Sequence, residues 1–248
     1  MTLAPGRRSS PAHLELPRSV DVPHPRQAFL RRNRFWAQRV LRGRWDLTLR
    51  DVEHVPADGP VVMVANHTGV LDGPLMAIMA PRPVHVLTKR EMYDGRLRGL
   101  LMASGQIPVH REGPDPAAVK SALRVLRDGG VVGVFPEGTR GAGEVERVKP
   151  GAAYLAMASG ATVVPVVFLG TRLPGGSNNS LPPPRSPIVM TFGPALAVAH
   201  RPWPRRQPDT HAFSLQIREA LRDTLAGAQR ATGMTLPGPI PGNDKEIL

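Results

Sequence analysis

The sequence predicts a single α/β domain in which helices flank a central sheet that is largely parallel or mixed. Short apolar runs alternate with segments of helical periodicity, which is typical of α/β sheets. The chain has 248 residues, enough to bury a large core, and shows no internal repeat. We expect the domain over 45–231, with poorly ordered tails at 1–25 and 232–248, where residues such as Pro, Gly and Arg accumulate without apolar periodicity.

The first predicted element is a basic amphipathic helix over 26–44, ahead of the domain. Residues 26–50 hold eight arginines and one acidic residue. One side of a helical wheel carries Phe29, Leu30, Trp36, Ala37, Val40 and Leu41, and the other carries Arg31, Arg34, Arg39 and Arg42. A basic helix with Trp and Phe is typical of segments that lie in an anionic membrane interface. The alternative is a surface helix that packs its apolar side on the sheet.

The strands follow in order through the domain, each as a short run rich in β-branched or other apolar residues. They are expected at 45–49, 60–65, 84–87, 107–109, 131–135, 162–168 and 188–192. Helices fill the intervals between them. Asp115 followed by Pro116 predicts the start of one helix, and further helices are expected at 151–159 and 208–225.

Composition and charge narrow the classes of function. The net charge is +12, from 32 basic and 20 acidic residues, which suits an anionic partner. A basic protein that binds nucleic acid or another anionic surface is the alternative from a different class. Aromatic residues are only 4% and no zinc-finger, RNP-like or OB-like pattern occurs, so we expect no nucleic acid.

The absence of cysteine excludes disulfides and thiolate chemistry, and the 8 histidines do not cluster with the spacing of metal ligands. No stretch reaches the ~18–20 apolar residues of a spanning helix, and residues 1–25 lack the apolar region of a signal peptide. We therefore expect no metal, no transmembrane span, and peripheral or monotopic attachment at the cytoplasmic face of a membrane.

The stretch Asn66-His67-Thr68-Gly69-Val70-Leu71-Asp72 places a histidine and a carboxylate five residues apart, directly after a predicted strand. On a helix they would lie about 140° apart, and on a strand they would point to opposite faces. They meet only if the chain turns between them, which Gly69 permits. A carboxylate that holds one imidazole nitrogen leaves the other free to take a proton from a hydroxyl. His67 and Asp72 are thus a candidate general base with its orienting partner, or else a hydrogen-bonded structural pair.

A second unusual stretch, Phe135-Pro136-Glu137-Gly138-Thr139-Arg140, follows the predicted strand at 131–135. Pro136 cannot donate in a central ladder and Gly138 breaks regular structure, so a loop is expected at the end of this strand. Loops at the carboxyl ends of strands are where open α/β sheets bind ligands. Residues 137–140 are therefore candidates for substrate contacts.

Together these stretches resemble the signatures of the lysophosphatidic acid (1-acylglycerol-3-phosphate) acyltransferase family of glycerolipid acyltransferases. The NHxxxxD signature appears at 66–72 and FPEGTR at 135–140. GxIxxxR appears at 105–111, and an apolar strand with a central proline at 163–167. The family pattern has two further short segments, which are matched here by Lys89 with Glu91 and by Lys149 with Gly151. The resemblance covers roughly residues 45–195.

The resemblance implies an O-acyltransferase that moves a fatty acyl group from an acyl thioester to the free hydroxyl of lysophosphatidic acid, giving phosphatidic acid in phospholipid synthesis. The thioester, acyl-CoA or acyl carrier protein, is a co-substrate, and no cofactor is implied. The acceptor remains open between lysophosphatidic acid, glycerol 3-phosphate, another lysophospholipid and a glycolipid. With the anionic membrane surface, these are the expected partners.

The resemblance also implies the residues that act. His67 would deprotonate the acceptor hydroxyl, with Asp72 fixing its tautomer. The substrate-binding residues would be Lys89, Arg111, Glu137, Gly138, Thr139 and Arg140. Arg111 and Lys89, with Arg140, would neutralise the acceptor's phosphate. Three roles stay open for Glu137: orienting Arg111, orienting a substrate hydroxyl, or folding the loop. Gly138 would let backbone N–H groups approach the substrate.

Overall fold

The computed structural model describes residues 15–241 and has a seven-stranded sheet at its centre, in the order β1-β7-β6-β2-β5-β3-β4. The strands are β1 (Asp46–Arg50), β2 (Val61–Ala65), β3 (Val84–Lys89), β4 (Ile107–Val109), β5 (Val131–Val134), β6 (Thr162–Leu169) and β7 (Pro187–Phe192). All neighbouring pairs are parallel except β6 with β7, which is antiparallel. The predicted α/β class with a largely parallel or mixed sheet is confirmed, and every predicted strand is present.

The helices are α1 (Ala28–Arg44), α2 (Asp72–Met79), α3 (Arg98–Ala103), α4 (Pro116–Arg127), α5 (Gly151–Ser159) and α6 (Gln207–Thr232), with short 3-10 turns η2 (Val52–His54) and η3 (Arg90–Tyr93). Four of the α-helices lie between strands, as predicted, whereas α1 precedes the first strand and α6 follows the last. The Asp115 carboxylate accepts hydrogen bonds from the first N–H groups of α4, as its N-cap position predicts. The last helix runs beyond its predicted end, because Leu225 and Ala228 still pack on the sheet before Gly233 ends it.

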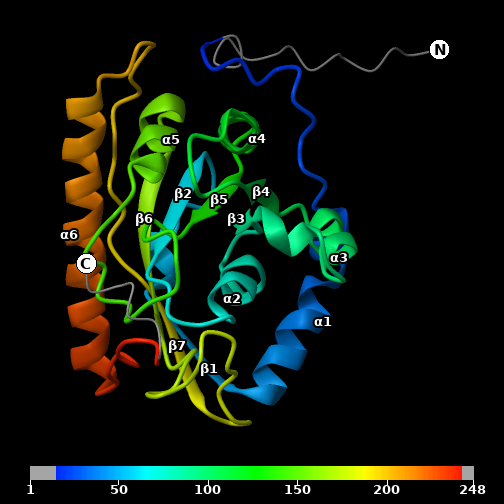
Figure 1. Cartoon of the computed structure of the whole chain (residues 1–248), viewed down its shortest axis with the longest axis vertical. Coiled ribbons are helices and arrows are strands. Elements are labelled where there is room, and N and C mark those ends of the chain that lie inside the picture. The colour runs from blue at the N-terminus through cyan, green and yellow to red at the C-terminus, as the bar shows by residue number, and fades with distance from the viewer. Residues whose placement is uncertain (1–14, 242–248) are drawn as a thin grey trace.

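The helices cover both faces of the sheet, and successive residues of a central strand enter different cores (Figure 1). Val62 and Val64 of β2 face the core formed with α4, α5 and α6. Val61 and Met63 face the core formed with α1 and α2. Every residue of β2 is buried, which explains why its sequence is a continuous apolar run rather than an alternation.

Helix α1 differs from the prediction, because its expected apolar side is divided. Leu30 is 6% exposed and belongs to the core, whereas Trp36 and Val40 are 66% and 70% exposed. Arg34, expected on the opposite side, lies against α2 and donates from Nε to the carbonyl oxygen of Ile78 at 2.8 Å. The last carbonyls of α2 lack partners within their own helix, and Arg34 supplies one. Burial lowers the pKa of Arg34 below its usual value.

The predicted tails lie partly outside the described residues, at 1–14 and 242–248. The described parts of these tails contact the domain. Arg124 of α4 donates to the carbonyl oxygen of Val20 at 2.8 Å, and Arg127 donates to that of Pro17 at 2.9 Å. Composition does not predict these contacts, because they join segments about a hundred residues apart. Within residues 15–241, no helix is both long enough and apolar enough to cross a membrane.

Candidate active site

The candidate residues gather at one edge of the sheet because the central strands run in the same direction. Strands β2, β3, β4, β5 and β6 are mutually parallel, so their carboxyl ends share an edge. His67 follows β2, Glu137 follows β5, and Arg111 follows β4. Lys89 is the last residue of β3. This is the edge at which open α/β sheets bind ligands.

The imidazole of His67 and the carboxylate of Asp72 are in direct contact. His67 Nδ1 lies 2.8 Å from Asp72 Oδ2. Asp72 is the first residue of α2 and is fully buried, whereas the His67 side chain retains 16% exposure. With Nδ1 held as the N–H by the carboxylate, Nε2 is the nitrogen left to accept a proton. The turn expected between the two residues is present.

The loop between them folds around the Asp72 carboxylate. Oδ2 also accepts hydrogen bonds from the backbone N–H groups of Thr68 at 2.8 Å and Gly69 at 2.9 Å. Gly69 is needed for a reason that the sequence does not reveal. Its φ is not positive, but a Cβ there would meet the carbonyl oxygen of Thr171 at 2.6 Å. The loop after β6 therefore leaves room only for glycine at this position.

Three residues of the segment after β5 hold His67. Its backbone N–H donates to Glu137 Oε1 at 2.9 Å, which corresponds to the loop-folding role among the three considered for Glu137. The ring of Phe135 stacks on the imidazole, with centroids 4.0 Å apart and an angle of 20° between planes. The backbone N–H of Gly141 donates to the carbonyl oxygen of His67 at 2.9 Å. His67 is thus fixed through its backbone and through one ring face.

Asn66 fixes the start of the same loop. Its Oδ1 accepts from the backbone N–H of Phe168 at 2.8 Å, and its Nδ2 donates to the carbonyl oxygen of Phe168 at 3.1 Å. The side chain thereby occupies a backbone amide's place beside β6 after β2 has ended. The sequence placed Asn66 in a signature without indicating this role.

A basic cluster lies beside this loop. Arg111 donates to the carbonyl oxygen of Gly138 at 2.8 Å, and Lys149 Nζ lies 3.4 Å from the carbonyl oxygen of Arg111. Gly138 has a φ of 79°, and its N–H closes a turn onto the carbonyl oxygen of Phe135 at 3.0 Å rather than pointing to open space. This cluster combines residues from two connections, the one between β4 and α4 and the one between β5 and α5.

Lys89 shares the electrostatic environment of Arg111. The pKa of the Glu91 carboxyl lies below its usual value, first because of a hydrogen bond to its own backbone and then because of the charges of Lys89, Arg111 and His110. Cations around one surface carboxylate make this edge of the sheet suitable for an anionic group. Among residues 15–241, Lys89 forms no hydrogen bond with His67.

Arg140 lies deeper than the other cations. It donates to the carbonyl oxygen of Asn178 at 3.1 Å and to Asn179 Oδ1 at 3.0 Å. Burial lowers the pKa of Arg140, and the charge of Asp72 opposes that shift. Within residues 15–241, Arg140 Nε and Asp72 Oδ1 are buried without a hydrogen-bond partner. Thr139 is exposed beside it and joins none of these contacts.

Two residues after β6, Thr171 and Arg172, belong to the site although no signature contains them. Thr171 Oγ1 lies 2.9 Å from Thr68 Oγ1, and Arg172 Nε donates to the carbonyl oxygen of Thr68 at 2.8 Å. Their position just beyond a predicted strand was the one available signal, because β6 is the parallel neighbour of β2.

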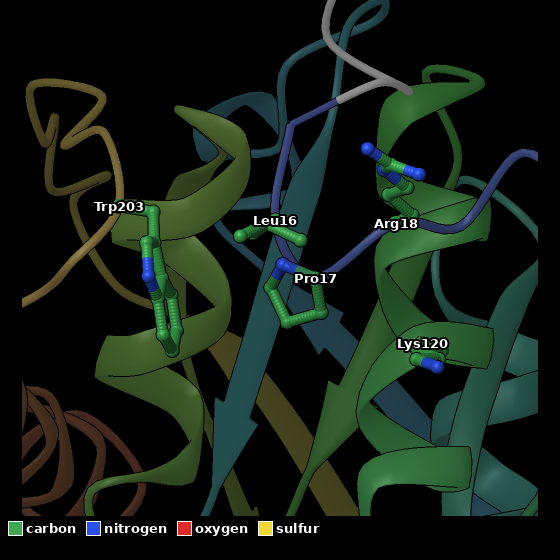
Figure 2. Close-up of a pocket in the computed structure, with 5 residues that line it drawn as sticks. All are labelled: Leu16, Pro17, Arg18, Lys120 and Trp203. Carbon is green, nitrogen blue, oxygen red and sulfur yellow. The ribbon is translucent and has the colours of Figure 1, made fainter.

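No cluster of three or more His, Cys, Asp or Glu side chains among residues 15–241 is arranged to hold a metal ion. A pocket of about 340 Å³ lies elsewhere, between α4 and α5 (Figure 2). It is lined by Leu16, Pro17, Arg18, Lys120 and Trp203, none of which is a candidate site residue.

Comparisons with known proteins agree on one family. The family described as Acyltransferase matches residues 46–169. The 1-acyl-sn-glycerol-3-phosphate acyltransferase of Bacillus subtilis is 31% identical over 133 residues, covering 53% of this chain and 66% of that protein. A Chlamydomonas reinhardtii protein with the same enzyme name is 30% identical over 225 residues, covering 87% of this chain and 60% of that protein. The aligned part thus spans less than two thirds of either relative.

A solved structure shows the same fold. The crystal structure of PlsC, the 1-acyl-sn-glycerophosphate acyltransferase of Thermotoga maritima, superposes with a TM-score of 0.57 and covers 82% of this chain and 78% of that chain. Sequence identity is 19%, so the likeness concerns the arrangement of strands and helices.

Proposed function

Because this chain belongs to the acyltransferase family, we propose that it transfers a fatty acyl group from an acyl thioester to the free hydroxyl of lysophosphatidic acid, giving phosphatidic acid. The names of the relatives support this acceptor. The observation that carries the proposal is the 2.8 Å contact between His67 Nδ1 and the buried carboxylate of Asp72 at the carboxyl edge of the sheet.

His67 acts as the general base in this proposal. Nε2 takes the proton of the acceptor hydroxyl while the hydroxyl oxygen attacks the thioester carbonyl carbon. The carbon–sulfur bond then breaks, and the departing thiolate takes the proton from the imidazolium. Asp72 holds the tautomer and stabilises the imidazolium without taking the proton. The acceptor hydroxyl is the nucleophile, so the reaction needs no serine or cysteine nucleophile.

The basic cluster beside the loop binds the acceptor's phosphate. Arg111 and Lys89 supply exposed positive charge, and Lys149 adds an ammonium group next to Arg111. Arg140 contributes through its charge, because its guanidinium already donates to Asn178 and Asn179. Glu137 supports His67 through the backbone rather than contacting the phosphate, which it would repel.

The exposed part of α1 attaches the protein to an anionic membrane, where a lysolipid acceptor already resides. Phe29, Trp36 and Val40 recur at positions i, i+7 and i+11 and are 48%, 66% and 70% exposed. Arg32 and Arg39 lie within one helical turn of Trp36 and are also exposed. Apolar side chains rimmed by arginines suit the headgroup region of an anionic bilayer.

An acyl-transfer assay of the purified protein tests the activity. It uses acyl-CoA and acyl carrier protein as donors, and lysophosphatidic acid, glycerol 3-phosphate, another lysophospholipid and a glycolipid as acceptors. We expect phosphatidic acid as the main product. Faster transfer to a different acceptor would reassign the substrate, and no transfer to any acceptor would reject the proposed activity.

A further inference from the structure

Arg172 is the largest fully buried side chain of the described domain, with 2% exposure. Burying a guanidinium is costly unless its N–H groups find acceptors. Four backbone carbonyl oxygens accept from it: those of Thr68 at 2.8 Å, Gly141 at 3.0 Å, Gly176 at 3.1 Å and Gly238 at 2.6 Å. These bonds use much of the hydrogen-bonding capacity of the guanidinium N–H groups and fix the orientation of the guanidinium.

The four carbonyl groups belong to different parts of the chain. Thr68 lies in the loop after β2, beside His67, and Gly141 lies in the segment after β5. Gly176 lies in the loop after β6, and Gly238 in the segment after α6, which turns back toward the sheet (Figure 1). One side chain therefore joins the two loops of the candidate site to the end of the domain.

The bond to Thr68 acts on a single peptide group. The carbonyl of Thr68 and the N–H of Gly69 share a planar peptide and point in opposite directions. Arg172 holds the oxygen at 2.8 Å, and Asp72 Oδ2 accepts from the nitrogen at 2.9 Å. A cation at the carbonyl also polarises the peptide and strengthens its N–H as a donor.

The bond to Gly141 acts on His67 itself. The N–H of Gly141 donates to the carbonyl oxygen of His67 at 2.9 Å, while the carbonyl oxygen of Gly141 accepts from Arg172 at 3.0 Å. Arg172 thus bonds directly to Thr68 and, through Gly141, acts on the carbonyl of His67. Rotation of the peptide group that carries the carbonyl of Thr68, or of the one that carries the carbonyl of Gly141, would break a bond to the guanidinium.

From this arrangement we propose that Arg172 is a positioning residue that holds the backbone of the His67–Asp72 loop, so that the carboxylate and the imidazole keep the geometry needed for proton transfer. The inference rests on the proposed function of that pair. Arg172 does not touch the reacting groups. It acts through the peptide groups of Thr68 and Gly141.

The test compares Arg172→Met and Arg172→Lys with Arg82→Met as the matched control. Arg82 also bridges two backbone carbonyls, donating to Pro56 at 3.1 Å and Gly129 at 2.6 Å. Its partners precede β2 and β5, so they lie at the opposite edge of the sheet from His67. Both variants remove a partly or fully buried guanidinium, but only one removes it from the site.

For Arg172→Met we expect kcat per folded molecule to fall by about 100-fold, since small misplacements of reacting groups have effects of that size. KM for both substrates should change little, because Arg172 contacts neither. Arg172→Lys should recover part of kcat, and Arg82→Met should lower thermal stability while keeping kcat within about twofold, because it is remote from the site.

Proton NMR supplies a readout that needs no activity. The Nδ1–H of His67 should give a low-field resonance, assigned by its loss in His67→Gln. We expect this resonance to shift or broaden in Arg172→Met and to stay unchanged in Arg82→Met. Folded Arg172→Met with kcat and the resonance of the wild type would overturn the proposal. So would failure of both Arg172 variants to fold, because that would indicate a purely structural role. A wild type that shows the resonance but transfers no acyl group would reject the proposed function instead.

Discussion

At the scale of single residues, the site depends on how His67 is held. Asp72 engages Nδ1, Phe135 covers one face of the ring, and Glu137 and Gly141 hold the backbone. None of these contacts occupies Nε2. The imidazole is therefore held at Nδ1, at one ring face and through its backbone, while Nε2 is left for a substrate proton, an arrangement that suits general-base catalysis.

Replacing His67 by Ala should lower acyl transfer by about 10²–10⁴-fold, the usual contribution of a general base. Asp72→Asn should also be severe, because the amide cannot hold the same tautomer. The measurement is kcat per folded molecule, with folding checked by circular dichroism. The control is His211→Ala, which removes an exposed histidine from α6. Turnover near that of the wild type in His67→Ala would remove the proposed base.

Neutralising Arg111 or Lys89 by Gln should raise KM for a phosphate-bearing acceptor more than KM for the thioester. For Arg111→Gln we expect about a tenfold increase, since a hydrogen bond to a charged group contributes roughly 1.5–3 kcal/mol and exposure places this one at the low end. Lys120→Gln, an exposed lysine on α4, is the control. Equal effects on the two substrates would indicate a structural role for these cations.

At the scale of elements, α1 has two sets of side chains that the helical wheel did not separate. Leu30 and Arg34 attach the helix to the domain, whereas Trp36 and Val40 face away from it. Because the exposed residues contribute little to the core, they can be changed without loss of folding. Arg34 is unsuitable for a test of membrane binding, because its guanidinium donates to α2 and a substitution would also disturb that contact.

Trp36→Glu should weaken binding to vesicles that contain anionic lipid, even at low salt, because it places a charge in the apolar contact. Changing both Arg32 and Arg39 to Gln should chiefly alter the salt dependence, since headgroup attraction is screened within a Debye length of ~10 Å at 0.1 M salt. Co-sedimentation measures both effects. Leu215→Glu, at a partly exposed position on α6, is the control. Unchanged binding by Trp36→Glu would place the attachment elsewhere.

At the scale of the whole molecule, one buried histidine should make stability depend on pH. His85 of β3 is 2% exposed, and its Nδ1 lies 2.7 Å from the carbonyl oxygen of Gly105. Burial is the largest cause that lowers the pKa of His85 from 6.5 to about 4. The unfolded chain therefore binds a proton between these values while the folded protein does not, so acid favours unfolding.

The contribution of His85 to stability is fully present above pH 6.5 and is lost as pH falls toward 4. The loss should be about 3 kcal/mol in the free energy of unfolding at pH 4, from 1.36 kcal/mol per pKa unit. Urea unfolding from pH 4 to pH 7 should show this slope in the wild type and a smaller one in His85→Asn. His211→Ala should keep the slope of the wild type. An identical slope in His85→Asn would assign the acid sensitivity to other groups.

Local sequence patterns were sufficient to predict much of the fold and part of the candidate site. The strands were predictable because a buried parallel strand needs an apolar run, and α4 because Asp115 and Pro116 begin it. The neighbourhood of His67, Glu137 and Arg111 was predictable because parallel strands bring their carboxyl ends to one edge. In each case the relevant residues lie within a few positions of one another or follow a strand end.

Other features depended on contacts between distant parts of the chain. Gly69 is required by the backbone of Thr171, and the carbonyl of Thr68 is held by Arg172, 104 positions later. The division of α1 follows from the position of α2. A sequence pattern records the period of an element and the chemistry of its side chains, whereas the partner of a buried polar group depends on which segments fold against each other. The general base could therefore be nominated from residues 66–72 alone, but what holds it in place emerged only when the loops after β2, β5 and β6 came together.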